Sequence, residues 1–365
     1  MDVEVHRVLV DARVHDRRGG FVAGLGRADF ELLVDGKERE IDDVLEVRHE
    51  ATPAPAGKPA PATAVTPAPQ PPADDPASRF PRRLVVVLDL QSGIGVRARH
   101  EAAKWLAREL KEGDRVTVAT VVWGLHFLVR DEAYTPRIAA LIERSQFSYE
   151  TGSLGLAALD QEFLSGGGKV SSGISLQKIQ ESVAGEGTRA AYSLAKSLAT
   201  LGETLADEPG PKTILLFSDG PRVPPGDLLP FYSFFGSQVV RKLAAASATI
   251  YAIESHGPTS GTRAEDRGVG RPFVPPPMGA NPGNDVLHFA ANETGGHHFY
   301  NTWDFPAVLD RVSTTTSSFY LLSFVPDDAP RGGYHKILVR VRRPGLEIGH
   351  RLGYLDPATS EAKRH

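Results

Sequence analysis

The chain has 365 residues, 41% of them hydrophobic and 24% charged, which is the composition of an ordinary folded protein. Its 41 basic and 45 acidic residues give a formal net charge of −4, and so balanced a charge argues against the basic surface that nucleic-acid binding needs. The absence of cysteine excludes disulfides, thiolate metal sites and cysteine nucleophiles, and no apolar run is long enough to cross a membrane.

Residues 1–50 are predicted to form β structure. A largely apolar stretch starts at Phe30 and runs into Asp35-Gly36, a strong signal for a hairpin turn. A segment of this size has too little core to fold alone, so we expect it to pack against another part of the chain. Residues 51–80 are rich in proline and alanine and almost free of large apolar side chains, which predicts an extended, semi-rigid linker.

Residues 81–318 alternate between apolar strands and amphipathic helices. Strands are predicted at residues 84–89, 116–122, 127–130, 213–217, 249–253 and 298–300. Helices are predicted at residues 97–112, 134–144, 188–205, 226–246, 284–294 and 304–316. This alternation indicates an α/β domain with a doubly wound, mostly parallel sheet. Residues 148–187 are rich in glycine and serine, and we predict a long, mobile insertion there, after which Thr188 begins a helix.

After residue 318 the pattern returns to β structure, with strands predicted at residues 319–325, 337–341 and 346–354. This C-terminal segment, residues 319–358, is again too small to bury a core of its own. We therefore expect residues 1–50 and 319–358 to pack together, although they lie at opposite ends of the chain. The result would be a small β-sandwich that flanks the α/β domain.

Polar side chains gather at the predicted strand ends of the α/β domain. Asp89 and Asp219 each follow an apolar strand, and Gly187-Thr188 opens a helix. Ligands of doubly wound sheets bind beyond the carboxyl ends of the strands, so we expect these side chains near one another. Two carboxylates and a hydroxyl are the oxygen ligands that a hard divalent cation such as Mg²⁺ prefers.

The order of these motifs resembles that of von Willebrand factor type A domains, whose metal-ion-dependent adhesion site combines D-x-S-x-S, a threonine and an aspartate. The matching segments are Gly187-Thr188, Phe217-Ser218-Asp219-Gly220, Gly113-Asp114-Arg115-Val116 and Ala291-Asn292-Glu293-Thr294-Gly295-Gly296. The β flanks resemble those of bacterial type A-related proteins, typical of acidobacteria, through segments such as Asp29-Phe30-Glu31-Leu32 and Phe319-Tyr320-Leu321-Leu322. The resemblance spans nearly the whole chain apart from the linker and the insertion.

This resemblance implies a Rossmann-like fold, a protein partner and export from the cell. The first residues, Met1 to Glu4, carry no apolar signal region, so either the protein is cytosolic or its export signal is absent from this chain. The function implied is that of a non-enzymatic protein-binding or adhesion module whose partner contacts Asp89, Thr188 and Asp219. One alternative is a structural envelope protein with a vestigial site. Another is a Mg²⁺-dependent hydrolase, for which the sequence offers no obvious general base.

The first loop departs from the family pattern. Asp89 is followed by Leu90-Gln91-Ser92-Gly93, so Gln91 and Gly93 stand at the two serine positions and Ser92 is one residue out of register. The metal ligands that the resemblance implies are Asp89, Gln91, Ser92, Thr188 and Asp219, around Mg²⁺ or Mn²⁺. The alternative is that Asp89 and Asp219 are inherited features of the fold that cap strand ends through hydrogen bonds.

Two further groups of residues favour structural roles. The aromatic side chains of residues 231–235 are predicted to be core, with contact to a partner as the alternative. His297 and His298 are adjacent in a predicted strand and must therefore point to opposite faces, which disfavours a shared metal.

Overall fold

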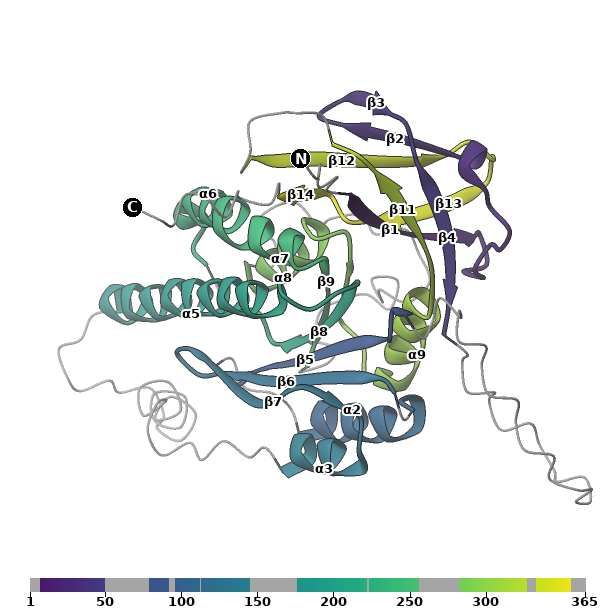
Figure 1. Ribbon diagram of the computed structural model, residues 1–365. Coiled ribbons are helices and arrows are strands. Elements are labelled where there is room, and N and C mark those ends of the chain that lie inside the picture. Colours follow the sequence, from purple (N-terminus) through teal and green to yellow (C-terminus); the bar gives the residue numbers. More distant parts are fainter. Residues whose placement is uncertain are drawn as a thin grey trace, which may run out of the picture.

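The computed structural model describes residues 7–49, 79–91, 96–111, 113–144, 176–221, 223–255, 282–326 and 333–355. Figure 1 shows a sheet with helices on both sides and, above it, a smaller part built from strands of both chain ends. The predicted linker lies almost wholly outside the described residues, and so do residues 145–175 of the predicted insertion. Among the described residues, no helix is long and apolar enough to span a membrane.

The larger part is built on a six-stranded sheet with the order β10-β9-β8-β5-β6-β7. Its strands are β5 (Arg83–Asp89), β6 (Arg115–Val121), β7 (Leu125–Ala133), β8 (Lys212–Ser218), β9 (Ala248–Glu254) and β10 (His297–Phe299). All neighbouring pairs are parallel except β6 and β7, which are antiparallel. The strand order reverses on either side of β5, so the predicted doubly wound, mostly parallel sheet is confirmed.

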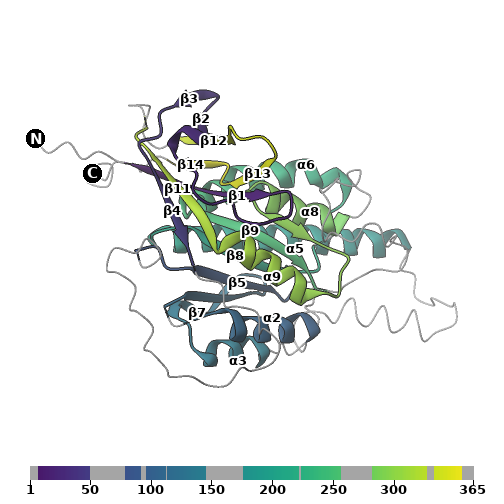
Figure 2. The ribbon, with the colours of Figure 1, turned by 90° about the vertical axis from the view of Figure 1, so that its right-hand side faces the viewer.

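Helices cover both faces of this sheet, as the two views in Figures 1 and 2 show. One face carries α2 (Val96–Glu109), α3 (Pro136–Arg144) and α9 (Phe305–Thr316). The other carries α5 (Leu176–Leu205), α6 (Pro225–Phe234), a π-helix (Phe235–Val240), α7 (Arg241–Ala245) and α8 (Pro282–Asn292). Alternate residues of β5 belong to the two cores, Val85 and Val87 to one and Leu84, Val86 and Leu88 to the other. This explains the unbroken apolar run, because both faces of a central parallel strand are buried.

The smaller part is a β-sandwich. Its strands are β1 (Val8–Asp16), β2 (Phe30–Val34), β3 (Lys37–Arg39), β4 (Asp43–Arg48), β11 (Ser318–Phe324), β12 (Tyr334–Val341), β13 (Leu346–His350) and β14 (Gly353–Leu355). They form two antiparallel sheets with the orders β13-β1-β11-β4 and β14-β12-β2-β3. Both sheets mix strands from the two ends of the chain, and residues such as Val10, Leu32 and Phe324 share one core. The predicted sandwich of the two terminal segments is confirmed.

Two predicted elements differ from the observed ones. Helix α5 begins at Leu176, twelve residues before Thr188, so the C-terminal end of the predicted loop insertion is helical. The glycines at 185 and 187 led to the error: each weakens a helix by about 1 kcal/mol but does not break it, and helix-favouring residues precede them. The single strand predicted at residues 346–354 is two strands, because the chain crosses from one sheet of the sandwich to the other at Arg351.

Two smaller predictions hold. In the aromatic group, Phe231 and Phe235 are buried in the core under α5 and α8, and Tyr232 and Phe234 pack against that core. His298 lies buried in β10, which pairs with β9, so it occupies a structural position in the sheet.

The seam between sandwich and sheet is closed by buried charge. From β1, Arg13 pairs with Asp11 and donates to the Thr249 hydroxyl at 3.1 Å and to the Tyr251 hydroxyl at 3.3 Å. At the corner between β13 and β14, Arg351 donates to the Ala244 carbonyl at 3.2 Å. The seam therefore fixes how the sandwich sits on the α/β domain.

Candidate functional site

The carboxyl edge of the six-stranded sheet gathers the polar residues that the sequence singles out. Asp89 ends β5 at the centre of the sheet, and Ser218 ends β8 beside it, directly before Asp219. On the other side of β5, β6 ends at Val121 and turns back into β7 through Trp123. Parallel strands bring these ends together although the residues are far apart in sequence.

Asp89 is only 1% exposed, and donors of the protein surround its carboxylate. The Ser218 hydroxyl donates to Oδ2 at 2.6 Å. The Gln91 backbone N–H and side-chain Nε2 both donate to Oδ1, at 3.3 Å and 3.2 Å. A buried carboxylate is tolerated only with such hydrogen bonds, so Ser218 and Gln91 hold the end of β5 in place.

Gln91 also connects Asp89 to the neighbouring turn. Its side-chain oxygen accepts a hydrogen bond from the backbone N–H of Trp123 at 3.1 Å. The amide group can do this because it offers donors and an acceptor together. Trp123 has φ +54° and is 55% exposed, an uncommon backbone conformation for a bulky residue. Gln91, which stands where the type A pattern has a serine, thus fixes the exposed Trp123 at the edge of the sheet.

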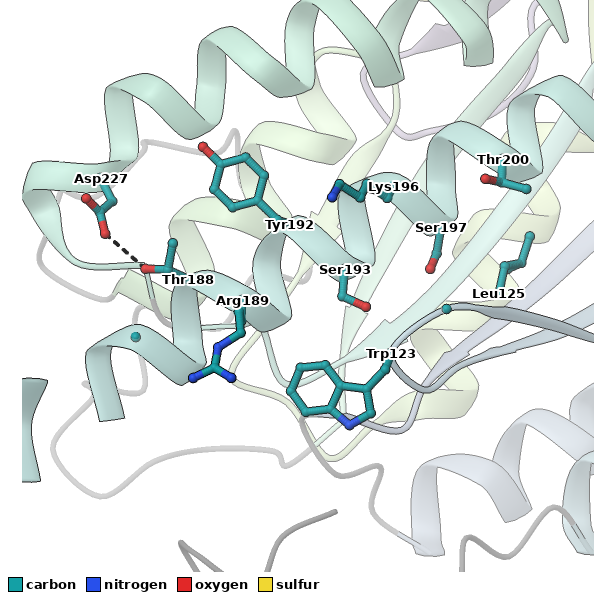
Figure 3. A pocket seen from close by; sticks show the side chains of 12 residues that line it. Trp123, Leu125, Thr188, Arg189, Tyr192, Ser193, Lys196, Ser197, Thr200 and Asp227 are labelled. Atoms are coloured by element: carbon teal, nitrogen blue, oxygen red, sulfur yellow. Dashed lines mark hydrogen bonds between the residues drawn. The ribbon is translucent and has the colours of Figure 1, made fainter. Parts of the chain in front are cut away.

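The two other predicted contact residues have partners of their own. Ser255 directly follows β9, and its hydroxyl donates to the carboxylate of Asp219. The Thr188 hydroxyl donates to the carboxylate of Asp227 at 3.0 Å, in the first turn of α6 (Figure 3). Asp89, Thr188 and Asp219 therefore each bond to a different side chain at the same edge, namely Ser218, Asp227 and Ser255.

Ser218, Asp227 and Ser255 are site residues that the sequence reasoning did not assign. Ser218 stands inside the motif Phe217-Ser218-Asp219-Gly220, where a hydroxyl directly before Asp219 on a strand end was a usable signal. Ser255 and Asp227 carry no local signal, because the fold alone brings them to Asp219 and Thr188.

A groove of about 530 Å³ opens beside these groups, between α5 and the turn from β6 to β7. We call it the α5 groove. Its lining comprises Trp123, Gly124, Leu125, Gly185, Thr188, Arg189, Tyr192, Ser193, Lys196, Ser197, Thr200 and Asp227. Figure 3 shows Trp123 across the groove from the side chains of α5. Among the described lining residues, Arg189 and Lys196 are cationic and Asp227 carries a carboxylate.

The predicted Mg²⁺ or Mn²⁺ site can be tested against these donors. Within the described residues, no group of three or more His, Asp or Glu side chains comes together, whereas the predicted set combines two carboxylates with hydroxyl and amide oxygens. The Thr188 hydroxyl is directed to Asp227, and the Asp89 carboxylate accepts from Ser218 and Gln91. In this arrangement the Asp89 carboxylate and the Thr188 hydroxyl are engaged by protein partners. Ser92 lies outside the described residues, so the predicted metal ligation remains a prediction.

No protein-family model matches the chain, and no curated protein matches it. Several solved structures are similar. A von Willebrand factor type A protein from Catenulispora acidiphila shares 10% identity at a TM-score of 0.32, with 97% of this chain and 75% of that chain covered. An aerotolerance-related membrane protein from Bacteroides fragilis NCTC 9343, carrying multiple mutations to serines, shares 11% identity at a TM-score of 0.34, with 64% and 98% covered.

The manganese-loaded TRAP protein of Plasmodium vivax shares 12% identity at a TM-score of 0.31, with 76% of this chain and 95% of that chain covered. Type A proteins, which the sequence motifs indicate, are thus among the similar structures. At these identities and TM-scores the likeness assigns no residue of this chain. The narrower resemblance to acidobacterial proteins remains a prediction.

Proposed function

We propose that the protein is a non-enzymatic protein-binding module that takes its partner at the carboxyl edge of the six-stranded sheet, as an adhesion domain does. The observation that carries this proposal is the exposed Trp123, which Gln91, anchored on the buried Asp89 and Ser218, holds at that edge. Tryptophan is among the residues most enriched in the centres of protein interfaces, because it offers a large apolar area with few rotatable bonds.

The backbone at Trp123 supports the same conclusion. A left-handed conformation costs a residue with a side chain about 1–3 kcal/mol, and such strain persists only where surrounding contacts impose it. Here Gln91 supplies such a contact at 3.1 Å, and half of the indole remains in solvent. An exposed ring in a strained turn adds little to the stability of the folded protein. It does favour the binding of a partner, because the contact is already formed before the partner arrives.

In this proposal the predicted residues have different roles. Thr188 and Asp219 contact the partner, and buried Asp89 acts by holding the turn that presents Trp123. Binding then requires no metal, since the Gln91 amide replaces the connection that a cation would make between neighbouring loops. The division into residues 1–50, 51–80, 81–318 and 319–358, and export to the periplasm, cell surface or medium, belong to the same proposal.

A photo-crosslinking experiment tests the proposed function. The photoreactive residue benzoylphenylalanine replaces Trp123 and, in a matched control, the exposed Leu338 on β12 of the sandwich. In cells that make the protein, irradiation is expected to give a discrete protein adduct from position 123 and none from position 338. Adducts from both positions alike, or none from position 123, would contradict the proposal.

The alternatives give different results in the same experiment. A structural envelope protein with a vestigial site would crosslink through the sandwich rather than the edge. A Mg²⁺-dependent hydrolase would turn over phosphoester or peptide substrates in the presence of metal and lose that turnover on Asp219→Ala.

A further inference from the structure

The α5 groove carries an inference about what kind of partner binds, and this inference rests on the proposed function. We propose that the groove takes an extended, acidic peptide segment of the partner. Three features of its lining point to this ligand: two hydroxyls without a partner, a spacing that matches an extended chain, and two cations beside an exposed indole.

The hydroxyls of Ser193 and Ser197 are the first feature. Both oxygens are buried and have no hydrogen-bond partner within the described residues, and Ser197 is only 3% exposed. Both residues line the groove, and Figure 3 shows their side chains on the side of α5 that faces it. A buried polar group without a partner costs about 1–3 kcal/mol, so a ligand that bonds to these hydroxyls recovers that energy.

Other hydroxyls on the helices of this protein behave differently. The hydroxyl of Thr204, further along α5, donates to the carbonyl of Thr200 at 2.9 Å, one turn earlier. On α9, Thr314, Thr315 and Thr316 each donate to a carbonyl four residues back, at 2.8–2.9 Å. Helical serines and threonines commonly satisfy themselves in this way. Ser193 and Ser197 do not, which is what distinguishes the groove from an ordinary helix surface.

Their spacing is the second feature. Residues four apart in a helix are separated by about 6 Å along its axis. In an extended chain, every second residue recurs after about 6.6–6.8 Å. Ser193 and Ser197 can therefore bond to alternate peptide groups of one extended segment lying along α5. The lining residues of α5 run from Gly185 to Thr200, about 22 Å of helix, which accommodates six or seven residues of such a segment.

Charge is the third feature and sets the chemistry of the segment. Arg189 and Lys196 are exposed and lie on the groove about two helical turns apart. The carboxylate of Asp227 accepts from Thr188 at one end of the groove, which leaves positive charge dominant along the rest. A segment with two carboxylates spaced along it complements Arg189 and Lys196. Trp123 and Leu125, which also line the groove, offer an apolar surface for a side chain of the segment.

The test is a selection of peptides on the full chain. A display library of random twelve-residue peptides is selected against the protein, and the affinity of selected peptides is measured by fluorescence anisotropy. We expect selected peptides to be enriched in Asp and Glu. The charge reversal Lys196→Glu is expected to weaken them at least tenfold, whereas Lys104→Glu, on α2 at the opposite face of the sheet, is a matched control and leaves binding unchanged.

The hydroxyl variant separates binding from folding. S193A/S197A is expected to weaken the selected peptides several-fold while the melting temperature stays the same or rises, because the variant removes two buried hydroxyls without partners. A purely structural role would lower the melting temperature and leave affinity unchanged. Peptides without an excess of acidic residues, no peptide binding at all, or binding that neither variant weakens would overturn the inference.

Failure of this inference and failure of the proposed function give different results. If the adduct at position 123 forms but the selected peptides are not acidic, the partner binds the edge by other chemistry. If acidic peptides bind the groove but no adduct forms at position 123, the peptide-binding role of the groove is retained. The proposal that the partner contacts Trp123 is then wrong.

Discussion

Buried polar groups are used in different ways at two places in the molecule. One is the seam between the β-sandwich and the six-stranded sheet, and the other is the carboxyl edge of that sheet. At the seam, Arg13 finds a carboxylate and two hydroxyls within the protein. At the edge, Asp89 is satisfied as well, but the nearby Ser193 and Ser197 hydroxyls are not. The difference indicates that the Arg13 cluster of the seam is complete in itself, whereas the groove keeps two hydroxyls that the proposed ligand would satisfy.

Packing strengthens the contrast. At the seam, a Cβ on Gly295 would lie 2.2 Å from the His350 carbonyl oxygen. Lys212 is buried and donates to the Ala246 carbonyl at 2.8 Å, beyond the end of α7, where the helix dipole favours a cation. Burial lowers the pKa of this amine to about 8. Among the described residues, nothing comparable fills the α5 groove.

The largest effect is expected from breaking the seam. Arg13→Ala leaves Asp11 buried without its cation and should lower the free energy of unfolding by about 3–5 kcal/mol in urea denaturation. The matched control Arg340→Ala removes an exposed ion pair to Glu31, 3.7 Å long, and should cost less than about 1 kcal/mol. The double variant D11L/R13M should recover most of the lost free energy of unfolding. A small effect of Arg13→Ala on that free energy would show that the seam is not held by charge.

The second prediction concerns acid stability. His298 is buried, and its ring nitrogens have no hydrogen-bond partner among the described residues. Burial first, and then the nearby His288 and His297, lower its pKa to about 3. Between pH 6.5 and pH 3 the unfolded chain therefore binds a proton at this position that the folded protein does not. Stability is lost as the pH falls through this range, by up to a few kcal/mol.

Replacement of the histidine tests this assignment. His298→Leu should flatten the dependence of unfolding free energy on pH below 6.5. His126→Gln, at an exposed position on β7, is the control against which the slope is compared. Equal slopes in the two variants would rule out His298 as a source of acid lability.

The third prediction separates binding from stability at the edge. Trp123→Gly should weaken the selected acidic peptide at least tenfold, because exposed tryptophans at interfaces contribute about 2 kcal/mol or more. The free energy of unfolding should stay the same or rise by about 1 kcal/mol, since glycine accepts φ +54° without strain. Trp303→Ala removes another exposed indole and serves as the control. Equal losses of binding in both variants would mean that Trp123 is not the particular contact.

A smaller effect is expected from Gln91→Ala. Loss of the bonds to Asp89 and Trp123 should cost about 1 kcal/mol of stability. The turn that carries Trp123 should also become more accessible to acrylamide quenching in a Trp303→Phe background, where Trp105 is buried. Unchanged quenching would show that Gln91 does not hold the turn.

The smallest effect is expected from divalent metal. A cation that binds the folded state at ten times its dissociation constant stabilises it by about 1.4 kcal/mol. Because Asp89 and Thr188 already bond to protein partners, we expect that millimolar Mg²⁺ or Mn²⁺ neither releases heat in calorimetry nor raises the melting temperature. Binding heat in the wild type that Asp219→Ala abolishes would restore the metal site predicted from the sequence.

Much of the fold could be predicted from the sequence because it follows from local patterns. Apolar runs such as that before Asp89 identify strands buried on both faces, and the alternation of strands with helices identifies a parallel sheet. Errors arose where tertiary packing overrides local signals. Two glycines near Thr188 suggested a loop inside what is the first half of α5, and Arg351 divides a predicted strand by anchoring to α7.

The sequence by itself determined the fold class, the pairing of the two terminal segments and the edge of the sheet at which the polar residues gather. Only the tertiary structure decided how those residues connect. Asp227 meets Thr188, Ser255 meets Asp219, and Gln91 joins Asp89 to the turn at Trp123. The physical reason is that periodicity encodes which face of an element is buried, whereas hydrogen-bond partners distant in sequence depend on how the packed elements finally meet.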